Sequence, residues 1–257
     1  MTMNELKKEF AVESGHWYMP DGSPMYTIRV GDKPERPTTL RDARRLGLFP
    51  SVTMIISLLS KPGLEKWKLR QAILAALTLP MNPDETLDDF AVRVTRDAKE
   101  QSRKRAEEGS AIHGSIDRAL QHKDFNPAHE KFVTAVLEEL KKLGDGWHSE
   151  RSFASPLGYG GKVDLHNDKM VIDFKTKEFS ETSDNLAWPE QCMQLAAYRA
   201  GLGMPLDARG INIFISVNNP GLTRVHEWDQ SLLDTGFEKF RLLLAYWQLD
   251  KKYLEKT

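Results

Sequence analysis

Residues 158–175 constrain the fold of this chain more than any other segment. Two short runs of β-branched and aromatic residues, 163–165 and 171–174, have the composition of buried strands. Between them, Asn167 and Asp168 are residues that favour a tight turn. The segment therefore predicts a hairpin of two strands inside a sheet.

Three charged residues lie on these two predicted strands. Asp164 falls near the end of the first strand, and Asp173 and Lys175 are two apart on the second, so the latter two side chains point to the same face. Charges in an apolar setting are costly unless something uses them. A bound divalent metal would offset this cost, because carboxylate oxygens suit Mg²⁺ or Mn²⁺. A lysine beside them can hold water or a phosphate oxygen. A surface hairpin with solvated charges would explain the same three residues.

Two further motifs place polar residues four apart on helices. Gly109 and His113 share one face of a helical stretch. Gln194 and Tyr198 share one face of a later helix, which the pattern predicts over residues 189–200. Taken singly, each has a plain structural explanation, such as a packed histidine, a helix crossing at glycine, a core tyrosine or a solvated glutamine.

The motifs occur in the order Gly109-x-x-x-His113, Asp164, Asp173-Phe-Lys175 and Gln194-x-x-x-Tyr198. In this order they resemble the RecB-type branch of the PD-(D/E)XK nuclease superfamily, and in particular they are similar to phage exonucleases and to the mitochondrial genome maintenance exonuclease. An upstream Phe-Pro-Ser-Val-Thr segment (residues 49–53), followed by an apolar helix, is also similar to that branch. The resemblance extends over roughly residues 48 to 200. One departure is Val163, which stands where the family name has proline.

The resemblance implies a role for each matching residue. Lys175 would orient or help to deprotonate the attacking water. Gln194 and Tyr198 would brace Lys175 and contact DNA near the scissile phosphate, and Gly109 would allow close approach of the helix to DNA or to the sheet. The implied ligands of Mg²⁺, for which Mn²⁺ would substitute, are His113, Asp164, Asp173, the carbonyl of Phe174 and, as a second-tier candidate, Glu150.

The charge of the chain is nearly balanced. The net charge is −1 and the pI about 6.7, which is mild evidence against a nucleic-acid binder. A local basic cluster at Arg103, Lys104 and Arg105 precedes Gly109 and is a candidate DNA contact, although a solvated helix face explains it equally well.

Other features bound the location of the protein. The single cysteine, Cys192, excludes an internal disulfide and fits a reducing compartment. No apolar run reaches the length of a membrane span, and the first residues lack the pattern of a signal or transit peptide. We expect a cytoplasmic protein of a bacterium or a phage-infected cell that binds DNA ends, single-stranded or duplex, and no membrane. A recombination or replication protein is a possible partner.

The predicted fold class is α/β, with a PD-(D/E)XK core of mixed sheet and flanking helices, an N-terminal hairpin over residues 16–28 and a helical lobe. The predicted parts are an N-terminal extension (residues 1–47), a helical lobe or arch carrying the Gly109 motif (residues 48–146) and the nuclease core (residues 147–257). We expect a metal-dependent DNA exonuclease of recombination, repair or phage replication. A non-catalytic DNA-binding subunit and a structure-specific endonuclease are the alternatives.

Overall fold

The computed structural model describes residues 16–60 and 62–253. The chain divides into two compact units, one formed by Met1–Leu58 together with Thr134–Thr257 and the other by Leu59–Val133. The predicted division into three parts, with other boundaries, stays a prediction.

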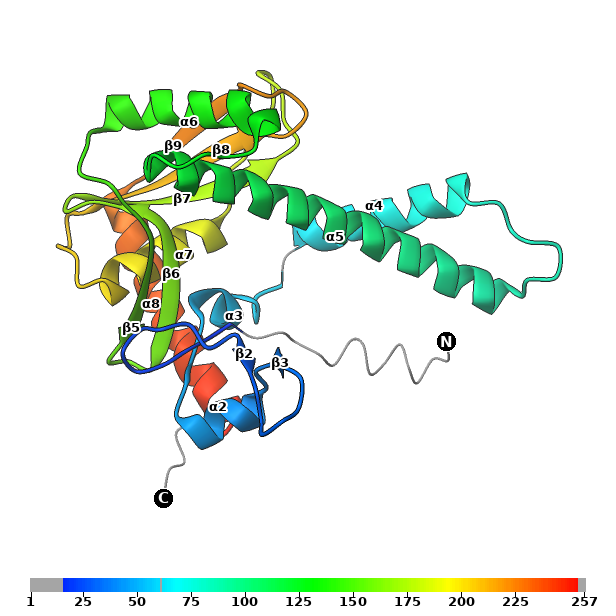
Figure 1. Ribbon diagram of the computed structural model, residues 1–257, viewed down its shortest axis with the longest axis horizontal. Coiled ribbons are helices and arrows are strands. Elements are labelled where there is room, and N and C mark those ends of the chain that lie inside the picture. Colours follow the sequence, from blue (N-terminus) through cyan, green and yellow to red (C-terminus); the bar gives the residue numbers. More distant parts are fainter. Residues whose placement is uncertain (1–15, 61, 254–257) are drawn as a thin grey trace. The chain divides into compact units, whose positions relative to one another are not determined.

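The first unit is built on a five-stranded sheet (Figure 1). Its strands follow one another in chain order: β5 (His148–Ser155), β6 (Tyr159–His166), β7 (Met170–Lys177), β8 (Arg209–Ser216) and β9 (Thr223–Trp228). Only β7 and β8 run parallel, and the other neighbours are antiparallel. The α/β class with a mixed central sheet and flanking helices is thereby confirmed.

Two helices explain how the parallel pair is connected and covered. α7 (Pro189–Gly201) carries the chain from the end of β7 back to the start of β8, as a parallel pair requires. Proline at its first position suits the fixed φ of that residue. α8 (Gln230–Asp250) packs along α7, and an alanine-sized side chain at Gly236 would touch Met193 of α7 at ordinary distance.

The antiparallel pairing of β6 with β7 ends early. It is limited to Leu165 opposite Ile172 and His166 opposite Val171, next to the turn. The same register would next place Asp164 opposite Asp173, and there the two strands separate. The two acidic residues therefore lie where the sheet opens.

The N-terminal segment differs from the predicted hairpin. Its turn forms, with a single bridge between Tyr18 and Pro24. However, β1 (Trp17–Tyr18) pairs with β4 (Phe49–Pro50), and β2 (Thr27–Ile28) pairs with β3 (Arg36–Pro37). The physical reason is burial, because Trp17 and Tyr18 are each 2% exposed and pack into the core of the unit rather than onto a free hairpin.

Two short helices in this unit follow their capping signals. α2 (Leu40–Leu46) starts at Thr39, whose hydroxyl and whose partner Asp42 form a reciprocal capping box, and it ends at Gly47 with a left-handed backbone. α3 (Val52–Ile56) is capped by Ser51, whose hydroxyl accepts from the Met54 amide.

The second unit is helical. α4 (Pro62–Thr78) packs on α5 (Leu87–Leu120), which is capped by Thr86 and at 34 residues is about 51 Å long. The short η1 (Pro127–His129) leads into α6 (Glu130–Leu143), whose later residues belong to the first unit. Across residues 16–60 and 62–253, no helix combines the length and the apolar character that crossing a bilayer demands.

Candidate active site

Asp173 is the centre of a ring of hydrogen-bond donors. It is 2% exposed, on β7, and Lys175 Nζ lies 2.8 Å from its Oδ1 and 2.7 Å from its Oδ2. Gln194 Nε2 donates to Oδ1 at 2.9 Å, and Asn212 Nδ2 donates to Oδ2 at 2.8 Å. Donors on both oxygens hold this buried carboxylate in one orientation.

The Asp164 carboxylate takes the place of a backbone acceptor where the pairing of β6 with β7 ends. Its Oδ2 accepts from the backbone amide of Phe174 at 2.8 Å, at the point where the pairing of β6 with β7 has stopped. Burial and then the charge of Asp173 raise the pKa of Asp164 to about 7. Two carboxylates thus share a poorly hydrated site, and a cation between them would relieve the repulsion.

Asn212 was not among the residues predicted for the site. It lies opposite Asp173 in the parallel pair, is fully buried, and donates to both the carboxylate and the main-chain carbonyl of Asp173. Its own Oδ1 accepts from Trp228 Nε1 at 2.8 Å. The available signal was an asparagine in the apolar strand Ile-Asn-Ile-Phe-Ile, because a buried amide needs polar partners.

Gln194 and Tyr198 lie one turn apart on α7, as the sequence predicts. Gln194 Nε2 donates to Tyr198 Oη at 2.9 Å as well as to Asp173, so its bonds support Asp173 and reach Lys175 only through it. Gln194 is 8% and Tyr198 5% exposed. Burial, followed by the charges of Asp173 and Asp164, holds the pKa of the Tyr198 phenol well above its usual range, so the phenol stays neutral.

Glu150 and Lys162 form an ion pair at the edge of the site. Glu150 is on β5, opposite Asp164 in register, with a left-handed backbone (φ 54°) that is unusual inside a strand. Its charge contributes to the raised pKa of Asp164. The structure therefore brings Glu150 near Asp164, one of the two predicted carboxylate ligands.

Two glycines before Lys162 allow side chains to approach the backbone of β6 closely. A Cβ at Gly160 would lie 2.6 Å from the Tyr18 side chain, and a Cβ at Gly161 would lie 2.7 Å from Phe153 and 2.9 Å from Tyr198. The Gly-Gly pair therefore makes room for the aromatic residues packed around the site.

The remaining predicted residues are on α5, in the helical unit. Gly109 is buried and His113 is half-buried, one turn apart. Arg103 is ion-paired with Glu100 at 2.7 Å and with Glu107 at 2.6 Å, so much of its charge is compensated within its own helix. The Arg105 guanidinium lies over the ring of Trp67, 5.6 Å from its centroid.

The donors in the first unit fit a hard divalent cation. Asp164 and Asp173 offer carboxylate oxygens and Phe174 a main-chain carbonyl, the oxygen chemistry that Mg²⁺ prefers. Within the described ranges, no cluster of three or more His, Cys, Asp or Glu side chains is arranged as a metal site. A Mg²⁺ ion here would thus need water or phosphate oxygens as further ligands, as Mg²⁺ commonly does in proteins.

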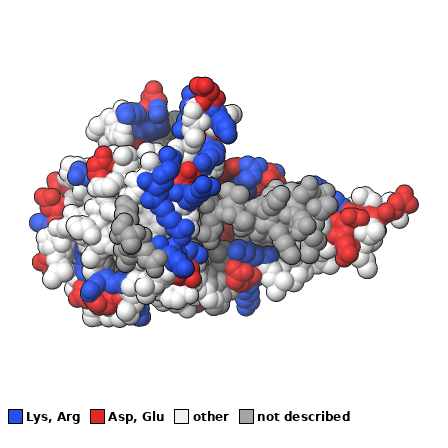
Figure 2. All heavy atoms as spheres, turned by 90° about the horizontal axis from the view of Figure 1, so that it is seen from below, with Lys and Arg blue, Asp and Glu red and all other residues white. Residues whose placement is uncertain are grey.

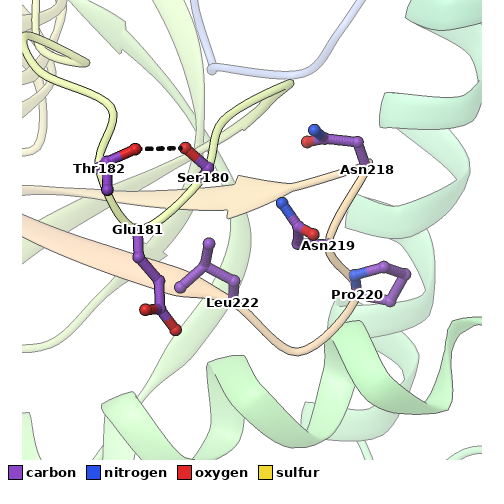
Figure 3. A pocket seen from close by; sticks show the side chains of 7 residues that line it. All are labelled: Ser180, Glu181, Thr182, Asn218, Asn219, Pro220 and Leu222. Carbon is purple, nitrogen blue, oxygen red and sulfur yellow. Dashed lines mark hydrogen bonds between the residues drawn. The ribbon is translucent and has the colours of Figure 1, made fainter.

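A separate pocket of about 540 Å³ lies at the ends of β7 and β8 (Figure 3). It is lined by the loop after β7 and by the turn between β8 and β9, and Glu181 is its one ionisable lining residue. It contains none of the residues around Asp173, so we do not assign it to the same site.

Comparisons with known proteins do not identify a family. No protein-family model matches the chain, and no curated protein matches it. Among solved structures, a protein called SSO0001 matches with 17% identity over 70% of this chain and 86% of its own, at a TM-score of 0.28. An alkaline exonuclease, LHK-Exo from Laribacter hongkongensis, matches with 14% identity over 75% of this chain and 96% of its own, at a TM-score of 0.35.

The same exonuclease in complex with dAMP matches with 14% identity over 72% of this chain and 90% of its own, again at a TM-score of 0.35. All these TM-scores are low, and the function is therefore argued from the site itself.

Proposed function

We propose that this protein is a Mg²⁺-dependent deoxyribonuclease that hydrolyses phosphodiester bonds from DNA ends. The observation that carries the proposal is the pair formed by the buried Asp173 and the half-buried Asp164, set where two strands separate, with Lys175 Nζ 2.7 Å from the Asp173 carboxylate. Two carboxylates this close together repel each other unless a cation is bound between them. A lysine beside them suits an anionic substrate.

The residues of the chain divide the work as follows. Asp164, Asp173 and the Phe174 carbonyl would hold the ion. Lys175 would orient the attacking water and offset the charge that develops on the phosphate oxygens. A bound Mg²⁺ would supply Lewis-acid polarisation and lower the pKa of water. Gln194 would position Asp173, to which it donates, and Tyr198 would position Gln194, while the predicted contact of both with DNA stays a prediction.

The near-zero net charge does not oppose this function. Figure 2 shows lysine and arginine side chains gathered along one part of the visible surface, with a few acidic side chains among them. Binding of DNA responds to such local fields rather than to the net charge alone.

The test is a gel assay with DNA labelled at its 5′ or 3′ end, single-stranded and duplex, in Mg²⁺ or EDTA. Lys175→Ala is compared with Lys169→Ala, a matched control because Lys169 is exposed at the turn of the same hairpin. We expect end-dependent loss of label with the wild type and Lys169→Ala, and none in EDTA or with Lys175→Ala. Undiminished cutting by Lys175→Ala would contradict the assignment. Mg²⁺ binding by calorimetry without any cutting would instead favour a non-catalytic DNA-binding subunit.

A further inference from the structure

Two aromatic rings from the N-terminal segment lie beside the candidate active site. His16 and Tyr26 stack with their ring centroids 4.4 Å apart and their planes at 26°. His16 is exposed and Tyr26 is half-buried, so one ring of the stack is open to solvent and the other is anchored. We call these two rings the aromatic stack.

The aromatic stack is fixed to the sheet through Tyr18. The Tyr26 and Tyr18 hydroxyls are 2.8 Å apart, and Tyr18 is 2% exposed. The Tyr18 side chain lies against Gly160 on β6, so closely that a Cβ at Gly160 would lie 2.6 Å from it. The stack is thus built on a rigid support.

The position of Gly160 places the aromatic stack relative to the carboxylates. Gly160, Lys162 and Asp164 alternate along β6 and face the same side. At the rise of a strand, Gly160 is about 13 Å and Lys162 about 7 Å from Asp164. The charge of Lys162 acts on His16, and Tyr26 and Asp164 both act on Lys162, in agreement with this order.

We propose, on the basis of the proposed nuclease function, that the aromatic stack is a binding platform for a nucleobase of single-stranded DNA next to the cleavage site. An exposed ring on an anchored ring offers a third ring a stacking surface that is tolerant of base identity. The Lys162 side chain, 39% exposed and ion-paired with Glu150, lies between the platform and Asp164, where its ammonium would contact the backbone phosphate alongside that ion pair. The platform thereby positions a strand so that a phosphate reaches the carboxylates.

The test uses the full chain carrying Lys175→Ala, which is expected to bind but not to cut. Single-stranded oligonucleotides carry the fluorescent base 2-aminopurine at successive positions from one end, in Mg²⁺. Stacking quenches this base, so we expect strong quenching at one or two positions only. Addition of His16→Ala should remove that quenching and weaken binding roughly tenfold. His16→Phe keeps a ring at the exposed position, leaves the Tyr26–Tyr18 hydrogen bond in place and should retain both signals.

Several outcomes overturn the platform. Unchanged quenching and affinity in both His16→Ala and Tyr26→Ala would do so while leaving nuclease activity of the wild type untouched. Equal loss in His16→Phe and His16→Ala would show that a ring is not what matters. Failure of the protein to bind any oligonucleotide would overturn the platform as well, and the gel assay then tells whether the nuclease function fails with it. Circular dichroism of each variant confirms that exposed His16 is not needed for folding.

Discussion

Asn212 shows how a single side chain can organise a site without any charge of its own. Its amide nitrogen bonds the Asp173 carboxylate and carbonyl, and its oxygen accepts from Trp228, so all three partners depend on one buried group. Hydrogen bonds to such supporting residues commonly decide the orientation of a metal-binding carboxylate.

We therefore expect Asn212→Ala to lower both stability and activity. Removal of the amide takes one donor from the buried Asp173 carboxylate, which keeps those of Lys175 and Gln194, and leaves the Trp228 indole N–H without its partner, at a cost of about 1–3 kcal/mol of unfolding free energy. Cleavage should fall roughly tenfold to a hundredfold, since the orientation of Asp173 is lost. Urea denaturation and the gel assay measure the two effects.

Two variants make the Asn212 experiment specific. Asn219→Ala removes the same side chain type from the exposed turn after β8; it loses its own hydrogen bond to the Phe179 carbonyl but leaves the bonds of Asp173 in place, so it should retain wild-type cleavage. Trp228→Phe removes the indole N–H together with one ring of the side chain, keeps the Asn212 amide in place and should reproduce part of the loss. Full activity in Asn212→Ala would mean that the remaining donors suffice to hold Asp173.

Much of the chemistry of the site could be anticipated from residue types and spacing. Asp164, Asp173 and Lys175 lie together as expected, because hairpin register and alternation along a strand are local properties. Asn212 could not be placed in this way, because its contact with Asp173 depends on which strand lies beside β7. The partners of Gln194 likewise depend on how α7 packs over the sheet.

The C-terminal end of α7 packs closely against the sheet, with Gly201 next to the ring of Phe153. At its last residue, Gly201, a Cβ would lie 1.9 Å from Cε2 of Phe153, whose ring also lies against Gly161. The ring therefore fills the space between β6 and the end of the helix. Because Gly161 and Gly201 both leave room for the Phe153 ring, α7 can pack close to the sheet, and Gln194 reaches Asp173.

We expect Gly201→Ala to destabilise the protein by about 1–2 kcal/mol. Alanine would gain up to about 1 kcal/mol from helix propensity, but the overlap with Phe153 forces a shift that typically costs about 1–3 kcal/mol. The matched control is Gly236→Ala in α8, where the nearest atom is 3.4 Å from the added Cβ, and there we expect no loss. Denaturation midpoints of the two variants give the comparison, and equal midpoints would show that Phe153 moves freely.

Regular elements were predictable to the extent that their signals are local. The two hairpin strands β6 and β7 and the helix α7 with Pro189 appear within a few residues of their expected bounds. The strand pairing of the N-terminal segment could not be predicted in this way, because Trp17 and Tyr18 pair with the distant residues Pro50 and Phe49. A turn signal fixes the turn but not which distant backbone completes the sheet.

The stability of the whole protein should depend on pH through Asp164. Its pKa is raised from 3.8 to about 7 in the folded state, so between these values the folded protein holds a proton that the unfolded chain has released. The stability that this group contributes is full below about pH 4 and is lost as the pH rises toward 7. A bound divalent cation should offset the loss, since it favours the deprotonated carboxylate.

We accordingly expect millimolar Mg²⁺ to raise the melting temperature more at pH 8 than at pH 5. Thermal unfolding in Mg²⁺ and in EDTA at both pH values measures this, and Asp164→Asn should remove most of the difference. An equal Mg²⁺ effect at both pH values would show that this carboxylate does not take part in binding the ion.

The spacing of the site residues along the chain also has a consequence for folding. Asp164 meets Phe174 across 10 residues, Gln194 reaches Asp173 across 21 and Asn212 across 39. Because the entropy cost of closing a loop grows with its length, the hairpin forms with fewer constraints than the contacts of α7 and β8. The two acids are thus brought together before the amides that support them arrive. We therefore expect α7 and β8 to bring their stabilising amides to a pair of acids that the hairpin has already placed side by side.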